Sequence, residues 1–365
     1  AGEEIVSKVV LIEKRPERVA RFEVTVSRPD GDILARGEAE VIAPIRPVQF
    51  DATDVPGLTV RRHVHFDRLL QRAEPLPAVA TAVVAPEEPN SLGGAILAAR
   101  HTLITPIFIG DRVRIAAAAA EIGADLTGYE LVDIPDHDAA AAAAVAMVHE
   151  GRARAVMKGH LHTDELLHHV FKREGGLRGR RRISHVFVMD VPGLTHLLMV
   201  TDAAINIAPT LEEKVDIVQN AIDLALALGI ETPRVGVLSA VETVNPKLPS
   251  TIDAAALSKM ADRGQIRGGL VDGPLAMDNA IDMAAARMKG IRSLVAGQAD
   301  ILMVPNLEAG NMLAKELTYL AHAEAAGIVV GAACPVILTS RADNEKARLA
   351  SCAVAVLHAA RSGGL

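Results

Sequence analysis

From Phe66 onward, short apolar runs alternate with alanine-rich amphipathic segments along the rest of the sequence. Apolar runs of strand length that are bounded by turn residues are typical of buried strands, and longer amphipathic segments are typical of helices. Regular strand–helix alternation predicts right-handed crossovers, which produce mainly parallel sheets with helices on both faces. The fold class expected for this part of the chain is therefore α/β, in three layers.

The alternation predicts a specific set of elements. Predicted strands are 105–109, 130–134, 155–157, 185–189, 197–200, 235–239, 269–271, 301–304, 328–331 and 335–338. Predicted helices are 111–123, 137–150, 211–229, 253–263, 276–289, 309–326 and 343–360. Because so many strands exceed the usual width of one open sheet, we expect two α/β domains.

Residues 1–45 follow a different pattern. Ranges 5–13, 19–28 and 33–42 alternate apolar with polar residues, as half-buried strands do, and the intervening RPDGD is a hairpin-turn signal. We expect a small antiparallel β segment here, which needs a partner surface to cover one of its faces. Residues 46–65 show no clear hydrophobic period and are predicted to form a linker.

Composition excludes several classes of partner. The chain has no Trp, only two Tyr and a formal net charge of −7. Neither base stacking nor general polyanion binding is therefore expected, and nucleic acid is not a predicted partner. The short basic run at 178–182 is interpreted as a solvated loop. No apolar stretch reaches the roughly 18 residues that a membrane span needs, so no membrane association is predicted.

Cys334 and Cys352 are the only cysteines in the sequence. Both lie in apolar stretches, where buried structural thiols are expected rather than nucleophiles or a disulfide framework. Two such cysteines in a chain of this length favour a reducing, cytoplasmic location.

Several familiar catalytic motifs are absent from the sequence. It has no Gly-x-x-x-x-Gly-Lys-Ser/Thr loop, no Gly-x-Gly-x-x-Gly after a strand and no Gly-x-Ser-x-Gly elbow. Nucleotide, dinucleotide and hydrolase-triad sites therefore lack their signatures. The histidines between 160 and 169 suggest a metal site, but no cysteine pair or His-Glu-x-x-His accompanies them. We expect no metal ion there, and a polar loop and helix surface instead.

Polar residues and glycines follow the predicted strands, at the place where open α/β sheets bind ligands. The candidate substrate-binding residues chosen on this ground are Lys158, Gly159, Thr201, Asp202, Asn206, Gly273, Pro274, Asp278, Asn306, Gly310 and Asn311. Each has a purely structural alternative: Asn306 or Asn311, for example, could simply cap the helix that follows. The functional interpretation is that amide groups there steady a carbonyl or phosphate oxygen.

The stretch PVILTSRADNEKARL (335–349) places Ser340 and Arg341 where a buried strand meets a helix. Free N–H groups at a helix start and a guanidinium suit a phosphate. Asp343 is close enough in sequence to take a proton from a nucleophile. The structural alternative is that Ser340 is an N-cap, Arg341 a surface charge and Asp343 an ordinary first-turn acid.

Six stretches together resemble the phosphate acetyl/butyryl transferase family. They are MKGHLHTDELL (157–167), RRISHVFVMD (181–190), MVTDAAINIAPTLEEKVDIVQNA (199–221), VDGPLAMDNAI (271–281), VPNLEAGNMLAKEL (304–317) and PVILTSRADNEKA (335–347). They occur in the family's order, and the resemblance extends from about Phe66 to the end of the chain.

The resemblance implies a phosphate acyltransferase: acyl-CoA and phosphate give acyl phosphate and CoA, for acetyl to butyryl chains. It implies two α/β domains with the active site in the cleft between them. Domain I would comprise 66–180 and 330–365, and domain II would comprise 181–329. A homodimer is also implied, with coenzyme A and phosphate as substrates and no tightly bound cofactor.

The family's Ser-Arg pair falls on Ser340 and Arg341, which implies that they stabilise the tetrahedral intermediate and hold phosphate or the CoA phosphates. Acetyl-type members carry a catalytic aspartate several residues after Ser-Arg-Gly, where this chain has Lys346 or Ala347. The Ser-Arg-Ala-Asp form resembles butyryl-type relatives and makes Asp343 the candidate base for the CoA thiol. At position 168 a histidine replaces the phosphate-binding arginine of acetyl-type members.

Residues 1–45 resemble the C-terminal part of a MaoC-like hot-dog domain, as in bifunctional enoyl-CoA hydratase/phosphate acetyltransferases. The hydratase signature of paired Asp and His is absent, so no hydratase activity is expected. Two alternatives stay open. One is a non-catalytic or weakly active acyl-CoA-binding module fused to a hydratase. The other is an acid-reductase or dehydrogenase relative that binds NADP.

Overall fold

The computed structural model describes residues 6–42, 63–339 and 344–363. They belong to two compact units, one within Ala1–Val60 and the other within Arg61–Leu365. Most of the linker predicted at 46–65 lies outside the described residues, which resume at His63 and enter the first helix of the second unit.

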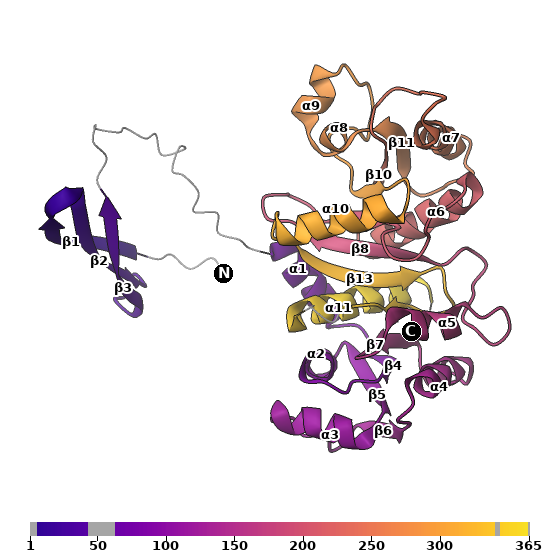
Figure 1. Ribbon diagram of the computed structural model, residues 1–365, viewed down its shortest axis with the longest axis horizontal. Helices are drawn as coiled ribbons and strands as arrows, with labels where there is room; N and C mark the ends of the chain where they lie inside the picture. The colour runs from indigo at the N-terminus through magenta and orange to yellow at the C-terminus, as the bar shows by residue number, and fades with distance from the viewer. Residues whose placement is uncertain (1–5, 43–62, 340–343, 364–365) are drawn as a thin grey trace. The chain divides into compact units, whose positions relative to one another are not determined.

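The first unit is a three-stranded antiparallel sheet (Figure 1). Its strands are β1 (Val6–Arg15), β2 (Val19–Ser27) and β3 (Ile33–Ile42), and a 3-10 turn (Pro16–Arg18) joins the first two. Gly31, with a φ of 98°, supplies the left-handed backbone that the second turn requires. Arg36 pairs with Glu23 on one face, and Phe22 and Val24 lie on the other. The predicted antiparallel segment is confirmed.

The second unit is built on one sheet, in the order β11-β10-β12-β9-β8-β13-β14-β7-β4-β5-β6. Its strands are β4 (Val79–Val84), β5 (Ile104–Gly110), β6 (Glu130–Asp133), β7 (Ala155–Lys158), β8 (Ser184–Asp190), β9 (Leu198–Thr201), β10 (Arg234–Leu238), β11 (Leu270–Leu275), β12 (Ile301–Met303), β13 (Glu324–Val330) and β14 (Val336–Ile337). The sheet is mainly parallel, which confirms the predicted α/β class.

Two parallel sets of strands run in opposite directions within this sheet. Strands β14, β7, β4, β5 and β6 are mutually parallel, and so are β9, β12, β10 and β11. Between the sets, β8 is antiparallel to both β9 and β13, and β13 is antiparallel to β14. The carboxyl ends of the two sets therefore lie at opposite edges of the sheet, which decides which strand-end residues can meet.

Helices cover both faces of the sheet. They are α1 (Val64–Ala73), α2 (Pro89–Arg100), α3 (Arg112–Glu121), α4 (His137–His149), α5 (Thr163–Phe171), α6 (Leu211–Ala227), α7 (Pro249–Asp262), α8 (Met277–Ile281), α9 (Met283–Met288), α10 (Leu307–Tyr319) and α11 (Glu345–Arg361). One face packs against α1, α2, α3, α6, α7 and α11. The other carries α4 and α5 over one set of strands and α8, α9 and α10 over the other. Within the described ranges, no helix is both long and apolar enough to cross a membrane.

The strand side chains alternate between the two faces, as the period of a β-strand requires. Val83 of β4 enters the core beneath α2, and its neighbour Val84 enters the core beneath α4. Both are fully buried. This double burial explains why the strands read as continuous apolar runs in the sequence.

The two domains predicted at 66–180 with 330–365 and at 181–329 share this one sheet. Their strands meet where β13 pairs with β14. Arg61–Leu365 forms a single compact unit, and the assignment of these ranges to two domains stays a prediction.

Some predicted boundaries are wrong. The predicted helix 309–326 ends at Tyr319, and β13 begins at Glu324. The alanine-rich sequence at 321–326 favours a helix. Strand β13 nevertheless pairs with β8 along its whole length, so tertiary pairing overrides the local helix propensity. The predicted helix 276–289 is two helices, because Asp282 caps a second helix start. The central strand β4 is not among the predicted strands, which begin at 105–109.

Candidate active site

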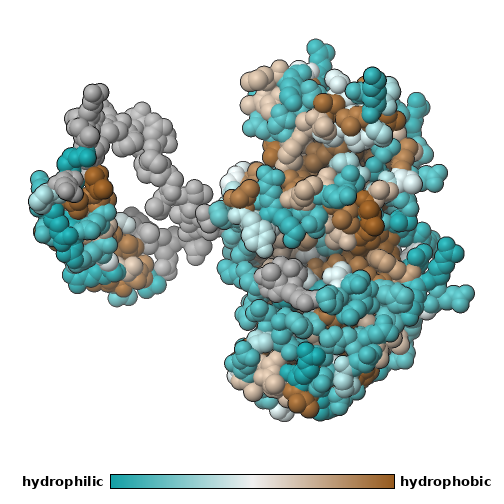
Figure 2. Space-filling view, in the orientation of Figure 1, coloured by the Kyte–Doolittle hydropathy of each residue, from teal (hydrophilic) through white to brown (hydrophobic). Residues whose placement is uncertain are grey.

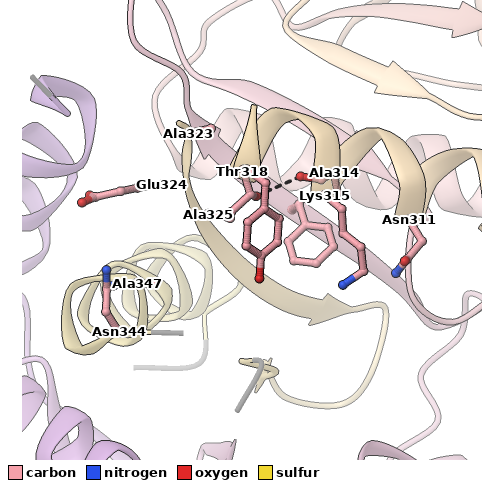
Figure 3. Close-up of a pocket in the computed structure, with 11 residues that line it drawn as sticks. Asn311, Ala314, Lys315, Thr318, Ala323, Glu324, Ala325, Asn344 and Ala347 are labelled. Carbon is pink, nitrogen blue, oxygen red and sulfur yellow. Dashed lines mark hydrogen bonds between the residues drawn. The ribbon is translucent and has the colours of Figure 1, made fainter. Parts of the chain in front are cut away.

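A pocket of ≈ 260 Å³ lies between α10 and the N-terminal end of α11 (Figure 3). Its lining residues are Phe187, Asn311, Ala314, Lys315, Thr318, Tyr319, Ala323, Glu324, Ala325, Asn344 and Ala347. Asn311 and Lys315 are one helical turn apart, and Figure 3 shows both side chains projecting from the same side of α10. Figure 2 shows apolar surface gathered near the middle of this face of the second unit. The pocket thus combines an amide and an amine with apolar walls.

The N-terminal end of α11 forms one wall of this pocket. Asn344 caps the helix, because its side chain accepts a hydrogen bond from the Ala347 N–H at 2.9 Å. The structural alternative in which Ser340 is the cap is therefore wrong. The predicted catalytic residues Ser340, Arg341 and Asp343 lie outside the described residues, so their roles stay predictions.

A buried arginine fixes the residue that precedes this segment. The guanidinium of Arg348 donates a hydrogen bond to the Thr339 hydroxyl at 2.7 Å, and both side chains are buried. Gly94 of α2 makes room for the arginine, because a Cβ at position 94 would lie 2.5 Å from Arg348 Cδ. A buried charge is stable only when it is hydrogen-bonded, so this contact ties the end of β14 to α11.

Three predicted residues shape the first turns of α10. Asn306 caps the helix by accepting a hydrogen bond from the backbone N–H three residues later at 3.0 Å. Gly310 permits a close approach to the chain after β9, because a Cβ there would lie 2.9 Å from the Asp202 carbonyl oxygen. Asn311 donates to the Ala203 carbonyl at 3.2 Å and also lines the pocket. Of the two asparagines, Asn306 is the cap and Asn311 reaches the pocket.

The carboxylate of Asp202 organises the loop after β9. It accepts hydrogen bonds from the backbone N–H groups of Ala204 at 2.9 Å and His185 at 3.1 Å, and from the side-chain amide of Asn206 at 2.5 Å. Burial raises the pKa of Asp202 above its ordinary value, while these hydrogen bonds act in the opposite direction. Thr201 donates to the His185 carbonyl at 2.8 Å. In this structure Thr201 and Asp202 hold backbone groups, and neither lines the pocket beside α10.

A second pocket, of ≈ 280 Å³, lies where β8 begins. It is lined by Phe171, Arg178, Gly179, Arg181, Arg182, Ile183, Ile205 and Asn206. Asn206 accepts a hydrogen bond from Arg182 Nε at 2.6 Å, and Arg182 also pairs with Glu213 at 2.5 Å. The basic run is therefore partly a structured pocket wall, and not only the solvated loop that the sequence predicts.

Lys158 ends β7 and Gly159 follows it, at the opposite edge of the sheet from Thr201. Lys158 is buried, and its Nζ donates to the Gly159 carbonyl at 3.1 Å. A side chain at position 159 would collide with the end of β4, since its Cβ would lie 2.4 Å from the Val84 oxygen. Because β7 and β14 are parallel neighbours, Lys158 and Gly159 lie at the same edge as Thr339.

The predicted residues Gly273, Pro274 and Asp278 are distant from the pocket beside α10. The Gly-Pro pair lies within β11, not after a strand as predicted, and four strands separate β11 from β13. At about 4.8 Å per strand this is roughly 24 Å. Asp278 lies on α8, where the Asn279 backbone N–H and then Lys289 hold its pKa below the ordinary value.

Burial limits which other groups can react. It raises the pKa of the Cys334 and Cys352 thiols to about 12, so neither is a nucleophile at neutral pH. It lowers the pKa of His185 to about 3, so this imidazole is neutral. Across 6–42, 63–339 and 344–363, no group of three His, Cys, Asp or Glu residues is placed to hold a metal ion.

Comparison with known proteins decides the family. The family model described as "Phosphate acetyl/butaryl transferase" matches residues 136–356. A Rhizobium meliloti protein named phosphate acetyltransferase is 62% identical over 296 residues, which cover 81% of this chain and 94% of that protein. The chain belongs to the phosphate acetyl/butyryl transferase family. The family resemblance predicted from the sequence is confirmed.

Relatives of this transferase include a butyryl-type protein and a solved structure. A Clostridium beijerinckii phosphate butyryltransferase is 44% identical over 298 residues, covering 82% of this chain and 99% of that protein. The crystal structure of a branched-chain phosphotransacylase from Enterococcus faecalis V583 is 32% identical, with a TM-score of 0.66, and covers 76% of this chain and 98% of that one. The fold class is confirmed by this likeness as well.

Sequence reasoning missed three residues that build the pocket beside α10 and its support. Lys315 is one helical turn after Asn311 within the quoted VPNLEAGNMLAKEL stretch, so helical spacing could have indicated it. Arg348 is a charge in an otherwise apolar helix, which is a signal of a buried polar contact. Phe187 gave no signal, because nothing in its strand distinguishes a pocket wall from a core residue.

Proposed function

We propose that this transferase catalyses the reversible reaction of acyl-CoA with inorganic phosphate to give acyl phosphate and CoA, for acetyl to butyryl chains. The observation that best supports this is the pocket in which Asn311 and Lys315 meet the first turn of α11. An amide, an amine and the free N–H groups of a helix start suit a phosphate and a developing oxyanion. Among the described residues, Lys315 has no hydrogen bond or ion pair, so its charge is available to an anion.

The predicted catalytic residues keep the roles that the family resemblance implies. Arg341 would hold phosphate or the CoA phosphates, and Ser340 would stabilise the tetrahedral intermediate. On the family resemblance alone, Asp343 would be the base for the CoA thiol. Two neighbours support this placement, because Thr339 is tied to α11 by Arg348 and Asn344 lines the pocket.

The other predicted substrate-binding residues divide into three groups in this proposal. Asn311 contacts substrate directly. Lys158, Gly159, Thr201, Asp202, Asn206, Asn306 and Gly310 support the walls through the backbone contacts described above. The third group lies at the far edge of the sheet and comprises Gly273, Pro274 and Asp278. No direct contact with the acyl group is proposed for these residues.

The substrates are coenzyme A and phosphate, and no tightly bound cofactor or metal ion is required by the chemistry. We further propose that the protein is a homodimer, located in the cytoplasm, and that 66–180 with 330–365 and 181–329 act as two domains. The resemblance of residues 1–45 to part of a MaoC-like domain also stays a proposal, together with the expected lack of hydratase activity.

A direct assay tests the proposal. Phosphate-dependent release of CoA from acetyl-, propionyl- and butyryl-CoA is followed with a thiol reagent, and omission of phosphate is the control. Turnover that requires phosphate is expected with at least one acyl-CoA. CoA binding by calorimetry without turnover on any of the three would instead favour the non-catalytic acyl-CoA-binding module.

A further inference from the structure

Two adjacent glutamates after β4 have opposite environments. The carboxylate of Glu87 is fully satisfied: one oxygen accepts the Asp111 N–H at 3.0 Å, and the other lies 2.6 Å from Arg114 and 3.0 Å from His137. The carboxylate of Glu88 is only partly satisfied, because its Oε1 is buried without a hydrogen-bond partner among the described residues. A buried carboxylate oxygen without a donor is costly, so its presence requires a reason.

The partner of Glu88 is His160. Its Nδ1 lies 3.1 Å from Glu88 Oε2, although the two atoms are not aligned for a hydrogen bond. Its other ring nitrogen, Nε2, makes no hydrogen bond to the described residues. The His160 and Glu88 side chains are 33% and 27% exposed, so a substrate can reach them. The pair has the composition of a proton-transfer dyad with one ring nitrogen open.

The chain places this pair near Thr339, the last described residue before the gap at 340–343. The backbone N–H of His160 donates to the Ala85 carbonyl at 2.6 Å, which holds the turn after β7 against the end of β4. On the other side of β7, Met157 pairs in parallel with Ile337 of β14. Thr339 therefore lies about one strand spacing, roughly 4.8 Å, from the chain that leads to His160.

We propose that Glu88 and His160 form the proton-transfer dyad of the acyl transfer, in place of Asp343. The inference rests on the proposed function. His160 Nε2 takes the proton of the CoA thiol as the sulfur bonds to the acyl carbon of the acyl phosphate. The carbon–oxygen bond to phosphate then breaks, and the proton passes to the leaving oxygen to give hydrogen phosphate. The Glu88 carboxylate, 3.1 Å from Nδ1, stabilises the imidazolium by its negative charge. The reverse reaction uses the same groups in the opposite order.

His137, which pairs with the fully hydrogen-bonded Glu87, provides a matched control for this proposal. The variants are His160→Ala, Glu88→Gln and His137→Ala, all made in the full chain and assayed with acyl phosphate and CoA. His160→Ala is expected to lower kcat by about 100-fold with little change in KM, and added free imidazole should restore part of the rate. Glu88→Gln should lower kcat by less. His137→Ala should keep its kcat and show no response to imidazole.

The outcomes distinguish failure of the dyad from failure of the proposed function. Wild-type kcat in His160→Ala, or a loss that imidazole does not restore, overturns the dyad and returns the base to Asp343. If His160→Ala fails to fold, His160→Gln keeps the size of the side chain, and wild-type kcat in that variant overturns the dyad equally. Absence of turnover in the wild-type protein overturns the proposed function and the dyad together.

Discussion

The carboxylate of Asp202 accepts a hydrogen bond from the backbone N–H of His185, 3.1 Å away. On its other side, the His185 carbonyl accepts the Thr201 hydroxyl at 2.8 Å. Side chains from the end of β9 therefore hold the backbone of β8 on both sides of one residue. This fixes the strand whose Phe187, two residues further along, forms a wall of the pocket.

Replacing Asp202 by Asn is expected to destabilise the protein by about 2 kcal/mol, because a donor amide would face N–H groups that need an acceptor. Urea unfolding at neutral pH measures the change. The control is Asp216→Asn, since Asp216 accepts a single bond from the Arg182 N–H at an exposed site, and a change below about 0.5 kcal/mol is expected. Equal stabilities for the two variants would contradict the supporting role of Asp202.

The burial of His185 predicts a loss of stability in acid. Its pKa in the folded protein is about 3, whereas the unfolded chain binds a proton near pH 6.5. Between these values the unfolded state binds more protons, so stability falls as pH falls. The loss is about 1.4 kcal/mol per pH unit, or roughly 2 kcal/mol at pH 5.

The measurement for this prediction is the pH dependence of urea unfolding from pH 7 to pH 5. His185→Leu should flatten the slope without abolishing it, because burial also lowers the pKa of His358. An identical slope in His185→Leu would show that this residue does not titrate as described.

Much of the fold was predictable because the second unit buries both faces of its strands. Such strands give continuous apolar runs, which can be recognised without knowing which strands pair with each other. The strand–helix junction at 335–349 is identifiable on that ground. The direction of the strands was not predictable in this way. No sequence pattern near β8 and β13 indicates that these strands run antiparallel to their neighbours. Their antiparallel direction nevertheless decides that Thr201 and Lys158 lie at opposite edges of the sheet.

The candidate site was predictable only in part, for the same physical reason. Asn311 was found because it follows a strand, but Lys315 belongs to the site through a helical turn that brings it to the same pocket. The dyad of Glu88 and His160 depends on contact between the ends of β4 and β7, which are distant in sequence. Motif spacing carries no information about such a contact.

The amine of Lys315 is expected to bind the phosphate group of the substrate. Lys315→Met should raise KM for phosphate by about tenfold, the loss of roughly 1.4 kcal/mol of binding, with a smaller effect on KM for the acyl-CoA. Lys315→Arg should recover part of the affinity, because the charge is kept. Initial rates at varied phosphate measure the change, and Lys247→Met, at an exposed loop position, is the control. An unchanged KM for phosphate in Lys315→Met would exclude this residue from the phosphate site.

The first unit is not expected to contribute to acyl transfer. The second unit, Arg61–Leu365, holds the pocket, the dyad and the apolar cores that support them. The alignment with the Clostridium beijerinckii relative spans 298 residues, 99% of that protein and 82% of this chain, so a relative of that length lacks room for both units.

Deletion of residues 1–60 should therefore leave kcat and both KM values at those of the full chain, and leave the urea midpoint of the second unit unchanged. The two proteins are compared in the same phosphate-dependent assay, with circular dichroism to confirm that the shortened chain is folded. The isolated first unit, whose sheet exposes Val9 and Leu11 beside Phe22, should self-associate, because three strands with one apolar face need a covering partner. A folded but inactive deletion variant would show instead that the first unit completes the catalytic machinery.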